Sequence, residues 1–321
     1  MTLTRRDLST FLAAAVVAPV AARADTVRDP LVIARGAAAG DAPELTAGAY
    51  DQAVKDGADF LAAHLVVSKD GVLIARRDNE LSASTDIAVH PEFTDRHATK
   101  TIAGAERSGW FAEDFTLAEL KTLGCVAGDG RRGRAPAPSI LTFQEVVDFA
   151  RAACVRMARV VGVYAFIEDP AYFAGLNLAL EPRLAEAVRK NGYDSLAAAM
   201  ILASPDPAAL KTLARLTRAR RALRLVGDAA FDPAAVRAVA HAVAPDLTRV
   251  IDTSNPRKPL ATPLAGQAQA SGLAVHAWAA VDASQGLMEA AYAAGADAVL
   301  SELARPAARA RSHTMSENRE T

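Results

Sequence analysis

The chain has few of the features that mark several common functional classes. It contains two cysteines, Cys125 and Cys154, and a formal net charge of -1. The near-neutral charge gives no indication of nucleic-acid binding or of a polybasic membrane patch. The two cysteines are far apart in the sequence, which favours free buried thiols over a disulfide. We also find no Gly-rich phosphate loop, no Cys-x-x-Cys pair and no Gly-x-Ser-x-Gly elbow.

Long apolar runs are absent after the N-terminus, so we expect no transmembrane segment in the mature chain. The N-terminus itself has Arg5-Arg6, an apolar run from Phe11 to Val20 and small residues up to Ala24. This pattern predicts a twin-arginine signal peptide over residues 1–24, cleaved after Ala24, and a periplasmic or secreted protein. The alternative interpretation is an uncleaved amphipathic N-terminus.

The rest of the chain alternates strand-like and helix-like segments. Its roughly 290 residues suffice for one large barrel or two ordinary domains. The predicted strands are 31–33, 60–67, 159–168, 199–204, 223–227, 249–252, 274–281 and 298–301, with an extra ribbon at 72–75. The predicted helices are 46–55, 142–153, 182–191, 206–216, 233–243, 259–271 and 285–294. About eight parallel strands favour a (β/α)8 TIM barrel over a doubly wound sheet.

We therefore predict a barrel over residues 25–304. Residues 82–141 lose strand signals and become polar, which predicts an insertion that covers the barrel mouth. That segment includes a basic run at 128–134, interpreted as a solvated loop or as a contact for an anion. The polar tail at 305–321 is predicted to be disordered.

Several motifs recur in an order that resembles one enzyme family. They are Pro43-Glu44-Leu45-Thr46, Gly57-Ala58-Asp59-Phe60-Leu61, Lys69-Asp70-Gly71, His276-Ala277-Trp278 and the run from Gly295 to Glu302. Together they resemble the glycerophosphodiester phosphodiesterase family, especially its periplasmic members. The resemblance implies a barrel and hydrolysis of glycerophosphodiesters to glycerol 3-phosphate and an alcohol, in lipid metabolism. It also implies a divalent cation, calcium or magnesium, and two His residues acting as acid and base.

The departures from the family pattern fall on these functional positions. In an ungapped alignment, Arg35 and Arg77 replace the two His residues. Ala62, His64 and Phe166 stand at metal-ligand positions, Glu168 stands at a Lys position, and Glu44 is retained. Arginine has a pKa above about 12 and cannot exchange protons near neutral pH. No catalytic residue of the family is therefore intact, which predicts that its hydrolysis is lost or strongly impaired.

Three interpretations of this site stay open. Arg35, Arg77 and His64 could form a metal-free site for a phosphorylated or carboxylated small molecule, such as a glycerophosphodiester. Trp278 could stack on the ligand or pack the barrel rim. Alternatively, the arginines could pair with Glu44 and Glu168 and neutralise the cavity.

A residual metal site is the third interpretation. It would use Glu44, with His64 and Glu168 as further ligands, although two nearby arginines would repel a cation. The choice therefore lies between a weak or altered hydrolase and a pseudoenzyme that binds a small anion. The sequence does not indicate an oligomeric state.

Overall fold

The computed structural model describes residues 29–36, 42–127, 137–255 and 259–320. The predicted signal peptide and the basic run at 128–134 lie outside these ranges. Within them, no helix is long and apolar enough to cross a membrane.

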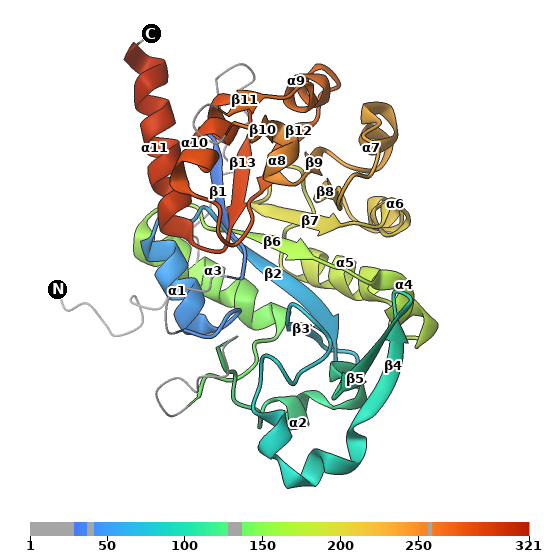
Figure 1. Ribbon diagram of the computed structural model, residues 1–321. Helices are drawn as coiled ribbons and strands as arrows, with labels where there is room; N and C mark the ends of the chain where they lie inside the picture. The colour runs from blue at the N-terminus through green and yellow to red at the C-terminus, as the bar shows by residue number, and fades with distance from the viewer. Residues whose placement is uncertain (1–28, 37–41, 128–136, 256–258, 321) are drawn as a thin grey trace, which may run out of the picture.

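Eight parallel strands form a closed barrel, which confirms the predicted (β/α)8 fold (Figure 1). They are β1 (Leu31–Ala34), β2 (Phe60–Val67), β6 (Gly162–Phe166), β7 (Met200–Ser204), β8 (Arg220–Arg224), β9 (Ala242–Ala244), β12 (Ala274–Trp278) and β13 (Ala298–Ser301). The barrel closes because β1 pairs with both β2 and β13. The carboxyl ends of all eight strands therefore meet at one mouth.

Helices surround this barrel and shield the outer faces of its strands. They are α1 (Ala47–Lys55), α3 (Phe143–Met157), α4 (Pro170–Gly175), α5 (Leu180–Lys190), α6 (Pro207–Leu216), α7 (Pro233–Val239), α8 (Leu247–Val250), α9 (Pro263–Ala270), α10 (Gln285–Ala293) and α11 (Ala304–Glu320). The local sequence determines where several of these helices begin. Thr142 and Glu145 form a capping box at the start of α3, for example, and so satisfy N–H groups that the first turn leaves free. Strand β2 is buried along its whole length, as expected for a strand covered on both sides.

The predicted insertion lies beside the carboxyl end of β2 (Figure 1). It follows β3 (Leu73–Ala75), which pairs antiparallel with β2. Its elements are η1 (Ile87–Val89), η2 (Pro91–Arg96), β4 (Ala98–Ile102), β5 (Ala105–Gly109), η3 (Ala112–Asp114) and α2 (Leu117–Leu120). The β4–β5 hairpin was not predicted, because most of its residues are polar and solvent-facing and give no apolar alternation.

The predicted strand at 249–252 is wrong as a barrel strand. The barrel strand is β9, whereas residues 247–250 form α8. Strand β10 (Ile251–Asp252) pairs with β11 (Leu260–Ala261) in a separate two-stranded sheet. The sequence predicted a helix up to Val243, because the alanine-rich run through β9 continues the apolar periodicity of α7. In the structure this helix ends at Val239.

The prediction of a disordered tail at 305–321 is also wrong, because residues 304–320 form α11. Ala307, Ala310 and Thr314 are buried at helical spacing, and the helix packs against α10 and β1. Arg311 forms an ion pair with Asp59 near the start of β2. A small-residue stripe and this ion pair anchor a segment whose composition alone looks solvated.

The cysteines are both free, as predicted. Cys125 is buried in the insertion, where its Sγ accepts a hydrogen bond from Arg76 at 3.3 Å. Cys154 lies on α3, and its Sγ accepts a hydrogen bond from the backbone N–H of Val161 at 3.1 Å.

Candidate functional site

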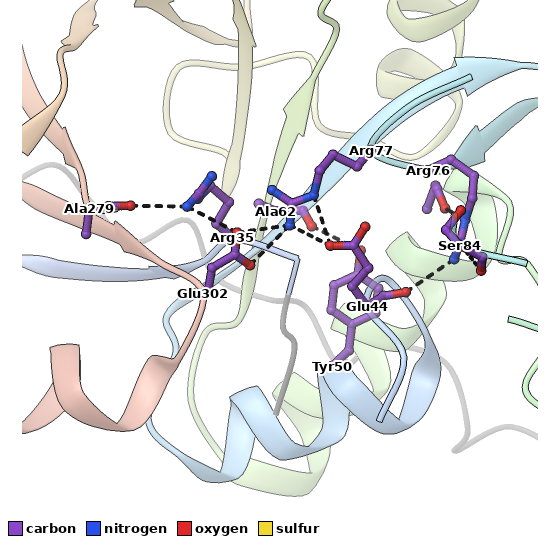
Figure 2. Close-up of polar contacts among 10 residues, drawn as sticks. Arg35, Glu44, Tyr50, Ala62, Arg76, Arg77, Ser84, Ala279 and Glu302 are labelled. Carbon is purple, nitrogen blue, oxygen red and sulfur yellow. Dashed lines mark hydrogen bonds and ion pairs between the residues drawn. The ribbon is translucent and has the colours of Figure 1, made fainter. Parts of the chain in front are cut away.

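Four charged side chains form a continuous network at the barrel mouth (Figure 2). Arg35 directly follows β1, Glu302 follows β13, Arg77 lies beyond β3, and Glu44 lies in the segment before α1. Arg35 Nη2 is 3.1 Å from Glu302 Oε1. Arg77 Nη2 is 3.0 Å from the same oxygen and 2.6 Å from Glu44 Oε2. Two guanidinium groups and two carboxylates therefore alternate in a neutral chain.

The inner half of this network is deeply buried. Arg35 is 8% exposed and Glu302 is 7% exposed. Arg35 Nη2 also donates to the carbonyl of Ala279 at 3.1 Å, whereas its buried Nε has no partner within the described residues. Burial lowers the pKa of Arg35, and the charge of Glu302 opposes that shift. Burial alone would lower the pKa of Arg77, but its hydrogen bonds to Glu44 and the charge of Glu302 raise this pKa overall.

Trp278, at the end of β12, is in contact with two guanidinium groups. The Cζ atom of Arg35 is 4.9 Å from the Trp278 ring centroid, and that of Arg224 is 4.6 Å away. Asp246 holds Arg224 through an ion pair of 2.5 Å. Cation–π attraction to both groups helps to hold the indole ring at the mouth.

His64 projects into the same region from β2. It is 4% exposed, and neither ring nitrogen has a hydrogen-bond partner within the described residues. Its ring centroid is 4.9 Å from that of Phe166 and 6.2 Å from that of Trp278. Burial, reinforced by the charges of Arg77 and Arg35, lowers its pKa well below 6.5. His64 is therefore a neutral imidazole with unfilled hydrogen-bonding capacity.

A pocket of about 190 Å³ opens beside the network. Its lining includes the cations Arg77 and Arg107, the carboxylates Asp78, Glu168 and Asp169, the aromatic residues Phe166, Tyr172 and Phe173, and His64. Arg107, from β5 of the insertion, pairs with Asp78 at 2.6 Å. The insertion therefore forms one wall of the pocket and the barrel strands form its floor.

Residues 35–302 match the family model of the glycerophosphoryl diester phosphodiesterase family. The chain belongs to this family. Glycerophosphodiester phosphodiesterase GDPD6 of Arabidopsis thaliana is 37% identical over 174 residues, covering 51% of this chain and 45% of the relative. The glycerophosphodiester phosphodiesterase of Treponema pallidum is 27% identical over 205 residues, covering 58% and 53%. The chain thus spans about half the length of these two relatives.

Solved structures of the family share the fold. The glycerophosphodiester phosphodiesterase from Agrobacterium tumefaciens has a TM-score of 0.62 at 18% identity, covering 87% of this chain and 99% of that one. An Oleispira antarctica phosphodiesterase, solved in complex with the product sn-glycerol-3-phosphate, has a TM-score of 0.62 at 18% identity, covering 88% and 96%. At this identity the likeness shows the fold alone.

The donor set at the mouth does not fit the divalent cation of the family. Glu44 and Glu302 are occupied by guanidinium groups, and the two arginines would repel a cation. Glu168 lines the pocket with His64, whereas Glu44 is not among its lining residues. No group of three or more His, Cys, Asp or Glu residues in the described part of the chain is placed to hold a metal.

The structure places the predicted anion-site residues Arg35, Arg77, His64 and Trp278 together at the mouth. Of the two carboxylates predicted to pair with the arginines, Glu44 does so with Arg77, whereas Glu302 and not Glu168 is the second one. Sequence reasoning missed the role of Glu302, although it ends a recognised family motif after the last strand. It also missed Arg224, which ends β8, because the predicted strand at 223–227 is displaced from the observed one at 220–224 and put this residue near the strand start.

Proposed function

We propose that this family member binds a small phosphorylated molecule at the barrel mouth without hydrolysing it by the metal-dependent reaction of the family. The observation that supports this proposal most directly is the network of Arg35, Glu302, Arg77 and Glu44. It sets two permanent cations where the family resemblance implies two titrating His residues. Such cations can attract a phosphate, but they cannot transfer protons near neutral pH.

Two arginines at the pocket keep donor capacity for a phosphate. Arg77 uses Nε and Nη2 for its carboxylate partners, which leaves Nη1. Arg107 uses Nη1 for Asp78, which leaves its other N–H groups. The neutral His64 adds one further donor and one acceptor. The bound product of the Oleispira antarctica phosphodiesterase supports a phosphorylated ligand of this size.

A weak or altered hydrolase is the second candidate, and Glu168 favours it. Burial, with the charges of Asp169 and Asp78, raises the pKa of Glu168. A carboxyl with a raised pKa beside the neutral His64 is a possible proton donor. The predicted twin-arginine signal supports a periplasmic or secreted location for either activity.

The two candidates separate in one experiment on the purified protein. Release of glycerol 3-phosphate from glycerophosphocholine is measured with calcium and then with chelator, beside an Arg35→His/Arg77→His variant. Binding of glycerol 3-phosphate is measured by calorimetry in the presence of chelator. We expect binding without turnover, weakened at least tenfold in an Arg77→Gln/Arg107→Gln variant but not in a Lys55→Gln/Arg156→Gln control on outer helices. Turnover by the unaltered protein, or no binding, would overturn the proposal.

A further inference from the structure

We propose that the pocket selects phosphodiesters whose alcohol carries an ammonium group over those whose alcohol is neutral. This inference rests on the proposed function, because it assigns the part of the ligand that lies beyond the phosphate. It concerns Glu168 and Asp169, which follow β6 directly.

Glu168 and Asp169 differ from the other carboxylates of the mouth because they have no partner. Neither makes a hydrogen bond or an ion pair within the described residues. By contrast, Glu44 and Glu302 are held by arginines, and Asp78 pairs with Arg107. The pocket therefore presents two adjacent acceptor groups that no hydrogen bond or ion pair of the described residues occupies.

The surroundings of these carboxylates favour the arrival of a cation. Glu168 reaches solvent, yet the pocket walls desolvate its carboxylate. Burial raises the pKa of Glu168 and of Asp169, the charge of Arg107 opposes both shifts, and the negative charge of Asp78 adds to them. An ammonium group would offset this repulsion, whereas a neutral hydroxyl would supply a hydrogen bond but no charge.

Aromatic side chains line the same pocket. Phe166 lies on its floor, and Tyr172 and Phe173 of α4 line its side with their ring centroids 5.2 Å apart. The face of an aromatic ring attracts alkylammonium groups. Phe166 also packs against His64, the buried side chain with two unpartnered nitrogens, which independently indicates a polar ligand here.

Opposite charges thus line two parts of one small pocket. Arg77 and Arg107 provide the cationic part, and Glu168 and Asp169 provide the anionic part. Within the described residues neither arginine forms an ion pair with Glu168 or Asp169, so both pairs of charges are available to one ligand in this pocket. The volume of about 190 Å³ is below the range of roughly 300–1,000 Å³ for drug-sized ligands. A compact zwitterion matches both the size and the charge separation.

The test compares two probes that share a glycerophosphate group. Glycerophosphocholine carries a cationic alcohol, and glycerophosphoglycerol carries a neutral one. Calorimetry in chelator measures both affinities for the full chain, for Glu168→Gln/Asp169→Asn, and for a matched control, Asp148→Asn/Glu186→Gln, on exposed positions of α3 and α5. The first variant removes two charges from the pocket with little change in shape.

We expect the unaltered protein and the control to bind glycerophosphocholine at least tenfold more tightly than glycerophosphoglycerol. In the pocket variant this ratio should fall to about one, with the affinity for glycerophosphoglycerol retained. Equal affinities in the unaltered protein would overturn this inference and leave the proposed function standing. A preference that survives in the pocket variant would also overturn it. Binding of neither probe would overturn the proposed function itself.

Discussion

Replacing Glu302 by glutamine should be the most destabilising single charge change at the barrel mouth. Glu302 accepts from Arg35 and Arg77, and it is the carboxylate that Arg35 contacts in the described part of the chain. Glutamine keeps nearly the same shape and one acceptor oxygen. The substitution therefore removes the negative charge and leaves the buried guanidinium of Arg35 with neutral partners, among them the Ala279 carbonyl and the Trp278 ring.

The magnitude follows from the burial of the two arginines. Removing one partner of a buried ion pair costs about 3–5 kcal/mol, because the other charge stays desolvated. Arg77 retains Glu44, and its side chain is 32% exposed, so it adds little. We expect a loss of about 3 kcal/mol for Glu302→Gln, which corresponds to roughly 6–12 °C in melting temperature. Glu44→Gln should cost about 1 kcal/mol, because that pair is more exposed.

Urea unfolding followed by circular dichroism measures these changes, with Glu186→Gln as an exposed control. A double-mutant cycle with Arg35→Gln isolates the interaction. The double variant should be more stable than the sum of the single losses predicts, by about 1–3 kcal/mol. If Glu302→Gln changes stability by no more than the control, within about 0.5 kcal/mol, the network does not stabilise the mouth and the reasoning is refuted.

Three further predictions concern residues outside this network. Arg76 is 1% exposed and donates hydrogen bonds to three backbone carbonyls. The substitution Arg76→Met should therefore lower the free energy of unfolding, measured in urea, by about 3 kcal/mol or more. A loss below about 1 kcal/mol would contradict this role of Arg76. Burial lowers the pKa of His276 to about 4. Between about pH 6.5 and 4 the unfolded chain therefore binds a proton at His276 that the folded chain does not. As the pH is lowered through this range, the free energy of unfolding should decrease by up to about 1.4 kcal/mol per pH unit. A His276→Gln variant should show a smaller decrease per pH unit. Tyr172 donates to the buried Glu113 at 2.5 Å, so Tyr172→Phe should lower the melting temperature by a few degrees, and an unchanged value would show that this bond contributes nothing.

The fold was predictable because barrel strands and helices leave strong local signals. Strand β2 is a continuous apolar run, and α3 begins with a capping box that is visible in the sequence. The errors occur where tertiary packing overrides the local pattern. Strand β9 has three residues of an alanine-rich stretch, and its pairing with β8 and β12 decides its conformation. Helix α11 looks polar along its length, but its alanines match the spacing of a buried stripe.

The residues of the site were easier to predict from the sequence than the ion pairs that they form. Strand ends converge in a parallel barrel, so the positions of Arg35, His64 and Trp278 could be inferred without coordinates. The choice of Glu302 over Glu168 as the partner of Arg35 depends on neighbouring strands. Strand β13 lies beside β1, whereas β6 lies beyond β2. That adjacency follows from barrel closure, which the strand order predicts, and so the partner could have been found by the same argument.

The arginines at the barrel mouth suggest how a site could bind a phosphorylated molecule without the metal-dependent hydrolysis of the family. A divalent cation supplies two positive charges, and Arg35 and Arg77 supply the same number, although Glu302 and Glu44 balance them within the network. The guanidinium charges are fixed to the chain, so a site built on them needs no metal ion and should be insensitive to chelator. They do not, however, lower the pKa of a bound water or release a proton, which are the tasks of a metal ion and a titrating His. In the proposed function a phosphate is therefore held by arginine N–H groups that the carboxylates leave free, and neither arginine transfers a proton near neutral pH, which is the distinction that the turnover and binding measurements test.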